Sequence, residues 1–499
     1  MPAFDLISEP WVSVDEGQPC GLARLLTDAH RLSVQVRGPE YTALMRVLTV
    51  LAARISGLDA HTSEEGFAAH RARVLAEGRL DAAAVEDYFA GNADAFDLFA
   101  PGRPWMQDPR LKSACPKTSG LWKLAWGRGT PDRPAHFWWG PLDLPIPAAQ
   151  AVLDLLTQLM FGAGGKVTAR ETAPGGKRAS TAGMGPLRGS VSYHPHGSTL
   201  FESLLLGMPY APRTGDDPAP WEGPLPDPMA PVPAPTGLAT LLLGRARHAI
   251  LLEADPDGTR VLDAWVTWGA QAAEEQVRDP FQLSFERSIG GRAVPLGQGQ
   301  RPVWRDLPAL VDPASAPPAW TRLFEDAPAL AVPPRLGLYA SGMEQDRGKS
   351  RDHDTIGHLY FDVGADLLDA DRRTALVERA TRAEEALQAL EEALALTHRL
   401  TRRPSKGEAH DIVLQFQRDA ETYVLRAAGP DPRSQALGVW ERRIRPHLGG
   451  SPEEIAADIK GRDLLEKLPV PPPAAAAPQG GPAPLPGHDQ TKEKEEAWT

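Results

Sequence analysis

Cysteine is scarce in this 499-residue chain, which holds only Cys20 and Cys115. Two thiols cannot build a zinc site with four cysteine ligands or a framework of disulfides. Such a low count fits a reducing compartment. We therefore expect a cytoplasmic protein without a cysteine-ligated zinc site, and we assign it no metal and no cofactor.

Long apolar runs and a leader segment are also missing. The chain has no run of about 18 apolar residues, so we predict no membrane span. The first residues, Met1–Leu6, lack the basic and apolar regions of a secretory signal. We expect no membrane partner.

Positive charge is not in excess. The chain has 53 Lys and Arg residues against 65 Asp and Glu residues, which gives a net charge of −12. A protein that coats nucleic acid over its whole surface would be basic, so this class is excluded. Local basic patches remain compatible with the total.

Complete catalytic signatures are missing as well. The runs at 164–167 and 175–178 contain Gly-Gly-Lys, but neither has the Ser or Thr that a phosphate-binding loop needs after its lysine. His353, Asp354 and His358 resemble part of a metal-hydrolase site, although about four ligands are required and no companion motif is present. We assign no catalytic residue, and a metal-dependent phosphohydrolase remains an alternative.

The pattern of the chain predicts an α+β protein: a large mixed N-terminal globular domain (1–365) followed by a C-terminal four-helix bundle (366–468). Helical spacing of apolar residues covers 44–51 and 152–159, and short apolar runs at 249–252 and 336–339 predict strands. The proline-rich stretch 209–235 predicts a long extended loop without packing, and 194–197 predicts a turn.

The C-terminal part predicts four amphipathic helices. They cover 371–403, 412–428 and 434–445, and the fourth begins after Ser451, an N-cap residue followed by Pro452 and two acids. Short connections favour a bundle. The proline-rich residues 469–499 predict a disordered tail.

Three segments combine glycine, basic residues and planar side chains: 126–140, 161–188 and 341–351. Glycine lets a backbone approach the floor of a DNA groove, while Lys and Arg hold phosphates. A loop tip with Gln and Met can enter between base pairs. Three solvated surface loops with no special role are the alternative interpretation.

The order of several landmarks bears on that choice. These are Phe4–Val12, Arg103–Gln107, Gly185–Gly189 followed by Thr199–Phe201, Asp279-Pro280, Trp304 and Leu338-Tyr339. The ordered set, with the helical ending, resembles the CasA family, the large subunits of type I-E CRISPR Cascade surveillance complexes. The resemblance spans about residues 1–468.

The resemblance implies a non-enzymatic subunit that recognises the protospacer-adjacent motif in double-stranded DNA and wedges the duplex open to start R-loop formation. Its implied partners are the backbone, small and handle-binding Cascade subunits, the guide RNA 5′ handle, the target duplex with its displaced strand, and the helicase–nuclease effector. A structural scaffold of another nucleoprotein assembly is a further alternative.

The family's functional segments are carried over by position. The glycine loop that enters the minor groove falls either at Gly162, Ala163, Gly164 and Gly165 or at Gly183, Met184 and Gly185. The duplex wedge falls at Met343, Glu344, Gln345 and Asp346, with Gln345 at its tip. The loop for the guide RNA and neighbouring subunits falls at Phe137, Trp138 and Trp139.

Basic residues beside these segments are the expected phosphate contacts: Lys166, Lys177, Arg178, Arg347, Lys349 and Arg351. Some relatives also insert a lysine from a loop that here falls at 269–276. That stretch has no lysine, and Gln271 is at best a substitute.

Overall fold

The computed structural model describes residues 2–15, 17–36, 38–130, 133–134, 140–173, 175–270, 277–283, 288–289, 292–293, 302–330, 336–343, 356–362 and 367–469. The chain divides into two compact units. Residues 1–382 with 424–427 form the first, and residues 383–423 with 428–499 form the second.

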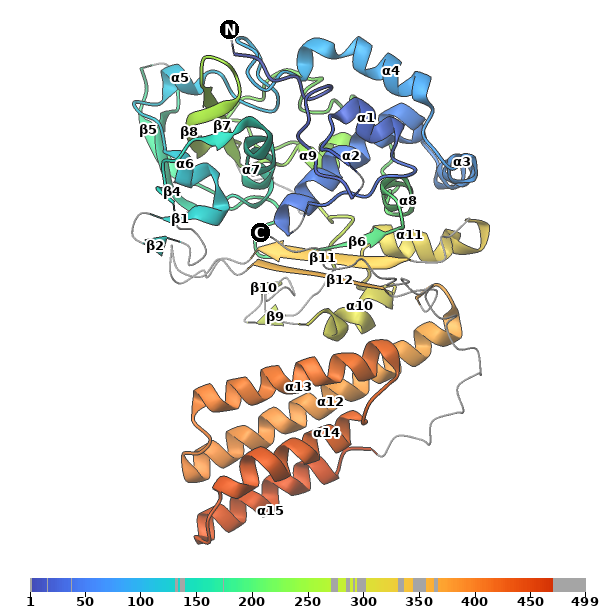
Figure 1. The fold of residues 1–499 in the computed structure, drawn as a ribbon, viewed down its shortest axis with the longest axis vertical. Coiled ribbons are helices and arrows are strands. Elements are labelled where there is room, and N and C mark those ends of the chain that lie inside the picture. Colours follow the sequence, from blue (N-terminus) through green and yellow to red (C-terminus); the bar gives the residue numbers. More distant parts are fainter. Residues whose placement is uncertain are drawn as a thin grey trace, which may run out of the picture. The chain divides into compact units, whose positions relative to one another are not determined.

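The first unit is built around one long buried helix, α2 (Pro39–Ser56), which packs against α7, α8 and α9 (Figure 1). Pro39 stands at its first position, and Gly57 ends it with a left-handed backbone at φ 72°. Further α-helices in the described part of this unit are α1 (Leu22–Thr27), α3 (Glu64–Glu77), α4 (Ala82–Gly91), α5 (Leu111–Ala114), α6 (Leu121–Leu124), α7 (Ala148–Phe161), α8 (Leu200–Leu206), α9 (Leu238–Leu243), α10 (Leu307–Val311) and α11 (Pro318–Asp326).

The strands form small antiparallel sheets. One has the order β3-β8-β7, with β3 (Ile146–Pro147), β7 (His248–Ala254) and β8 (Arg260–Trp268). A second has the order β12-β11-β6, with β6 (Val191–His196), β11 (Gly337–Met343) and β12 (Ile356–Asp362). The two-stranded pairs are β4 (Gly165–Glu171) with β5 (Arg178–Ala182), β1 (Gly129–Thr130) with β2 (Arg133–Pro134), and β9 (Ser288–Ile289) with β10 (Arg292–Ala293).

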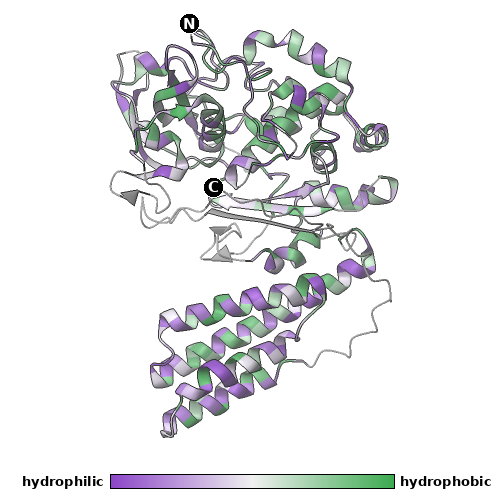
Figure 2. Cartoon of the chain, viewed as in Figure 1, coloured by the Kyte–Doolittle hydropathy of each residue, from purple (hydrophilic) through white to green (hydrophobic). Residues whose placement is uncertain are grey.

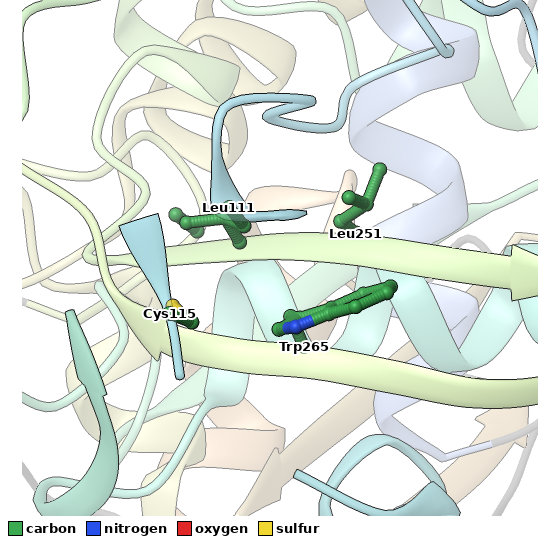
Figure 3. Packing of buried hydrophobic residues seen from close by; sticks show 5 residues of the cluster. Leu111, Cys115, Leu251 and Trp265 are labelled. Atoms are coloured by element: carbon green, nitrogen blue, oxygen red, sulfur yellow. The ribbon is translucent and has the colours of Figure 1, made fainter. Parts of the chain in front are cut away.

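The predicted strands at 249–252 and 336–339 are confirmed as parts of β7 and β11. In β7, Leu251 lies opposite Trp265 of β8, and both pack with Leu111 and Cys115 (Figure 3). This cluster buries one face of the β7–β8 pair under α5. The apolar runs that predicted strands are therefore core residues.

The turn predicted at 194–197 is wrong. Residues 194–196 complete β6, where His194 lies opposite Tyr339 of β11, and the His194 side chain is buried. Pro195 and Gly197 gave the stretch its turn-like composition. In the described sheet, β6 pairs only with β11, and an edge strand tolerates a proline because one side of its backbone needs no donor.

The proline-rich stretch 209–235 contains no helix or strand, as predicted, but it is packed, contrary to the prediction. Trp221 is buried and stacks on Trp105 with ring centroids 6.1 Å apart. Arg103 donates hydrogen bonds to the carbonyls of Pro220 and Gly223. Two residues of the Arg103–Gln107 motif therefore hold this loop on the body.

The same motif fixes β7. The Gln107 side chain is buried, its Nε2 donates to the carbonyl of Leu98 (2.7 Å), and its Oε1 accepts from the backbone N–H of Leu252 (2.8 Å). A buried amide with both ends satisfied stabilises the strand without charge. The motif is thus part of the scaffold.

The predicted helical ending is confirmed, and so is the predicted fold class. The helices are α12 (Ala370–Thr401), α13 (Lys406–Arg426), α14 (Pro432–Val439) continued by the π-helical turn η7 (Trp440–Ile444), and α15 (Pro452–Glu466). Ser451 caps α15 in a reciprocal capping box with Glu454. Polar and apolar residues alternate along these helices (Figure 2), as expected of amphipathic helices.

Long apolar helices are missing from the described ranges as well: none of the helices there is long and apolar enough to cross a membrane.

Candidate nucleic-acid interface

The two glycine segments that the sequence offered as alternatives lie against each other. The backbone N–H of Gly185 donates to the carbonyl of Gly162 (2.8 Å), and that of Leu187 donates to the carbonyl of Met160 (3.0 Å). The β4–β5 hairpin, which the sequence did not predict, begins with Gly165 opposite Ala182. The alternatives therefore belong to one surface, here called the glycine platform (162–165 and 183–185).

Close packing explains the glycines at the base of this platform. A Cβ atom on Gly185 would lie 2.5 Å from the carbonyl oxygen of Met160, and one on Gly162 would lie 2.5 Å from Nδ1 of His248. Both distances are too short for a side chain. These two glycines are required for the two segments to touch, whatever the platform binds.

His248, the first residue of β7, contacts the backbone of the glycine platform. Its Nε2 lies 3.1 Å from the carbonyl oxygen of Ala163. Burial lowers the pKa of His248 to about 4. The positive charges of Arg188, Arg247 and Lys123 also lower this pKa, whereas the hydrogen bond to Ala163 raises it. The imidazole is neutral at pH 7, and Nε2 carries the proton because a carbonyl only accepts.

Arg188 connects the platform to β11. Its Nη1 donates to the carbonyl of Phe161 (2.7 Å) and lies 2.7 Å from Sδ of Met343. The backbone N–H of Gly189 donates to the carbonyl of Met343 (2.8 Å). The end of β11 is thus held directly beside the end of α7, where the first glycine segment starts.

The structure changes the interpretation of Met343. Its side chain is 2% exposed, so it anchors the strand end and cannot itself enter a duplex from this position. Met343 pairs with Ile356 of β12, and the chain between them carries the rest of the predicted wedge. Glu344, Gln345 and Asp346 lie outside the described residues, and their role stays a prediction.

The predicted phosphate contacts fall into two groups. Lys166, Lys177 and Arg178 are exposed on or beside the β4–β5 hairpin, and Arg178 pairs with Glu171 at 3.1 Å. The pair lowers the net charge that Arg178 offers to a ligand. Arg347, Lys349 and Arg351 lie outside the described residues.

Two other arginines of the glycine-rich segment are interior. Arg188 is described above, and Arg170 forms a buried ion pair with Asp108 (2.7 Å) and donates to the carbonyl of Trp268 (3.3 Å). A buried, paired guanidinium is committed to the fold. Basic composition alone therefore overstates the positive surface of this segment.

The predicted aromatic loop, Phe137, Trp138 and Trp139, lies outside the described residues, but both of its flanks are tied down. Nη1 of Arg128 donates to the carbonyl of Leu142 (2.8 Å). Nε1 of Trp126 donates to Oε1 of Glu40 (3.3 Å). These bonds join the two ends of the loop to each other and to α2.

The carboxyl groups of Glu40 and Asp154 lie close to these flanking residues and share one hydrogen-bonding neighbour, Gln150. Nε2 of Gln150 donates to Glu40 (2.9 Å) and lies 3.4 Å from Oδ1 of Asp154. Burial and the nearby charge of Glu40 raise the pKa of Asp154 to about 8. Burial also raises the pKa of Glu40. The pair therefore holds a proton at neutral pH.

Most of the alternative metal site lies outside the described residues. His353 and Asp354 lie outside the described residues, and of His358 only the backbone, in β12, is described. Over the part of the chain that the structure describes, no group of three or more His, Cys, Asp or Glu side chains could hold a metal ion.

Sequence reasoning missed Lys123 and Arg247. Nζ of Lys123 donates to the carbonyl of Lys166 (3.3 Å), and Nε of Arg247 donates to the carbonyl of Ala270 (3.2 Å). Both lie beside the platform although they are far from it in sequence. The run Gly244–His248, with two arginines directly before a strand, was the one local signal.

Sequence comparison finds a matching family model. The model, described as CRISPR-associated protein Cse1, matches residues 5–448. A search of curated protein sequences finds no match.

Solved structures share the fold. A chain of a "CRISPR RNA-guided surveillance complex" is 33% identical, with a TM-score of 0.81 over 93% of this chain and 100% of that chain. A chain of a "CRISPR RNA-guided surveillance complex, pre-nicking" is 32% identical, with a TM-score of 0.76 over 95% and 100%. Thermus thermophilus CasA (Cse1) is 21% identical, with a TM-score of 0.69 over 94% and 99%, a likeness of fold alone.

Proposed function

The chain belongs to the CRISPR-associated Cse1 family, and on this premise we propose that it is a non-catalytic subunit of a type I-E CRISPR RNA-guided surveillance complex. In this proposal it recognises a short motif beside the target, opens the adjacent duplex and recruits the helicase–nuclease. The two solved surveillance-complex chains, each matched over at least 93% of this chain, support the first part.

The observation that carries the proposal for DNA is the junction of the glycine platform with the end of β11. Arg188 and Gly189 both bond to Met343, so a segment that reads a groove and a segment that separates bases would be held at a fixed spacing. Guide pairing replaces DNA pairing almost evenly. The protein need only offset the few kcal/mol of the first unstacked step.

The remaining partners follow from the same proposal. The aromatic loop at 137–139 would contact the guide RNA 5′ handle and the backbone and handle-binding subunits, and the helical unit would contact the small subunit and the displaced strand. Cys20 and Cys115 are free thiols and buried, which suits assembly in a reducing cytoplasm.

A structural scaffold in the same assembly is the second candidate, because the glycines at 162 and 185 are already explained by packing. The two candidates differ in one measurable property. A scaffold is needed for assembly, whereas a recognition subunit makes target binding depend on the bases beside the target.

The test uses the complex reconstituted with guide RNA, the full-length chain and a duplex that carries 2-aminopurine next to the motif. Gln345→Ala should weaken target binding and reduce the fluorescence rise on opening, while guide-RNA assembly persists; shortened glycine segments should weaken binding too. Gln18→Ala, the same change at an exposed bend, is the matched control.

Two results would count against the proposal. Duplex opening and target affinity that are unchanged both in Gln345→Ala and in the variant with shortened glycine segments would contradict the assignment of these residues to the DNA site. A complex without this chain that still found and opened its target equally well would leave only the scaffold.

A further inference from the structure

Positive charge gathers on the flanks of the glycine platform from elements distant in sequence. Lys123 lies on α6 and reaches the carbonyl of Lys166 at the start of β4. Arg247 directly precedes β7 and reaches the carbonyl of Ala270 after β8. The tertiary fold alone brings these two cations to one platform.

Arg247 lies on the backbone of the second glycine segment. A Cβ atom on Gly183 would lie 2.6 Å from Nη2 of Arg247 and 3.0 Å from its Cζ, so the guanidinium occupies the space that a side chain would take. The missing side chain at 183 thus serves to admit the arginine. The Arg247 side chain is half-buried. Burial and the neighbouring Arg245 both lower its pKa.

Within the described ranges, Arg247 differs from the interior arginines, which pair with carboxylates. Arg46 pairs with Asp279 and Arg170 with Asp108. Across the described ranges, no ion pair joins Arg247 to a carboxylate; the bond that its Nε donates goes to a backbone carbonyl. A half-buried guanidinium without an anion is unfavourable, and its forked N–H groups match a phosphate.

We propose that Arg247 and Lys123 are a pair of phosphate-binding residues that grip the backbone of the target duplex on either side of the glycine platform. The proposal rests on the proposed function and adds to it two residues from outside the glycine-rich segments. Their role is to fix register, because phosphate contacts carry no base sequence.

The test is the salt dependence of target binding by the reconstituted complex with the full-length chain. Each lost phosphate contact reduces the slope of log Kobs against log salt concentration by about 0.9. Arg247→Ala should reduce it by that amount, Arg247→Ala with Lys123→Ala by about twice as much, and Arg247→Lys should preserve it. Affinity for motif-bearing and motif-scrambled duplexes should fall by the same factor.

Arg213→Ala is the matched control, since it removes an exposed arginine from the proline-rich loop and should leave the slope unchanged. Circular dichroism melts of the Arg247 variants check that the body folds. A normal melt with an unchanged slope overturns the inference.

The two failures are distinguishable. If the wild-type complex ignores the motif, the proposed function is wrong. If it discriminates the motif and the Arg247 variants keep the wild-type slope, only this inference is wrong.

Discussion

Replacing Gly185 with alanine tests the contact on which the candidate site depends. The new Cβ would lie 2.5 Å from the carbonyl oxygen of Met160 and 2.8 Å from the backbone nitrogen of Gly162. Both neighbours are backbone atoms, so no side-chain rotation relieves the overlap. The second glycine segment must move away from the end of α7.

The size of the effect follows from what that movement breaks. Overpacking of a close contact costs about 1–3 kcal/mol. The shift also strains the hydrogen bonds from Gly185 to Gly162 and from Leu187 to Met160, each worth about 1 kcal/mol net. We expect a loss of about 2–4 kcal/mol in the stability of the body, and a thermal midpoint lower by roughly 5 °C.

The assay is a thermal melt of the full-length chain, followed by target binding of the reconstituted complex. Gly102→Ala is the control, because a Cβ there meets nothing within 4 Å, and its melt should match the wild type. If Gly185→Ala and Gly102→Ala have the same thermal midpoint, the two segments are not packed as described. If it loses stability but binds target normally, the platform is structural only.

Two further predictions concern buried charge. Asp279→Asn should destabilise the body by about 3–5 kcal/mol, because it removes the negative charge that lies 2.8 Å from the buried guanidinium of Arg46. Glu171→Gln, which breaks the exposed ion pair with Arg178, should reduce the stability by less than about 1 kcal/mol in the same melts. Equal losses of stability in the two variants would refute the distinction between the buried and the exposed ion pair. Asp154 has a pKa raised to about 8 by burial and by Glu40, so the folded state binds its proton more tightly than the unfolded state. Stability should therefore fall as pH rises from about 4 to 8, and Asp154→Asn should flatten that fall in melts across this range; the same pH slope in both proteins would contradict it.

The helices of the C-terminal part were predictable because their signals are local. A stripe such as Leu387, Leu390 and Leu394 is buried in α12 as its spacing requires, and Ser451 caps α15 with its own neighbours. The strands at 249–252 and 336–339 were predictable for a similar reason, since short apolar runs fill the core. The family could also be recognised from the sequence, because the order of its motifs is recognisable even where the spacing between them varies.

The errors came from residues whose structure depends on distant partners. His194 and Pro195 have the composition of a turn, but pairing with β11 makes them a strand. Met343, the first residue of the predicted wedge, is buried beside Arg188, which is 155 residues away in sequence, so no local pattern indicates this contact. The residue types of a segment indicate which structures it can adopt, but they do not indicate which distant residues pack against it.

Sequence by itself determined the fold class, the helical ending and the family resemblance, because each of these depends on the identity and spacing of neighbouring residues. Tertiary structure decided that the two glycine segments form one platform, that Met343 is an anchor, and that Lys123 and Arg247 flank the platform. These facts depend on contacts between residues about 20 to 155 positions apart in the sequence. The free energy of such contacts comes from packing, and no local pattern records it.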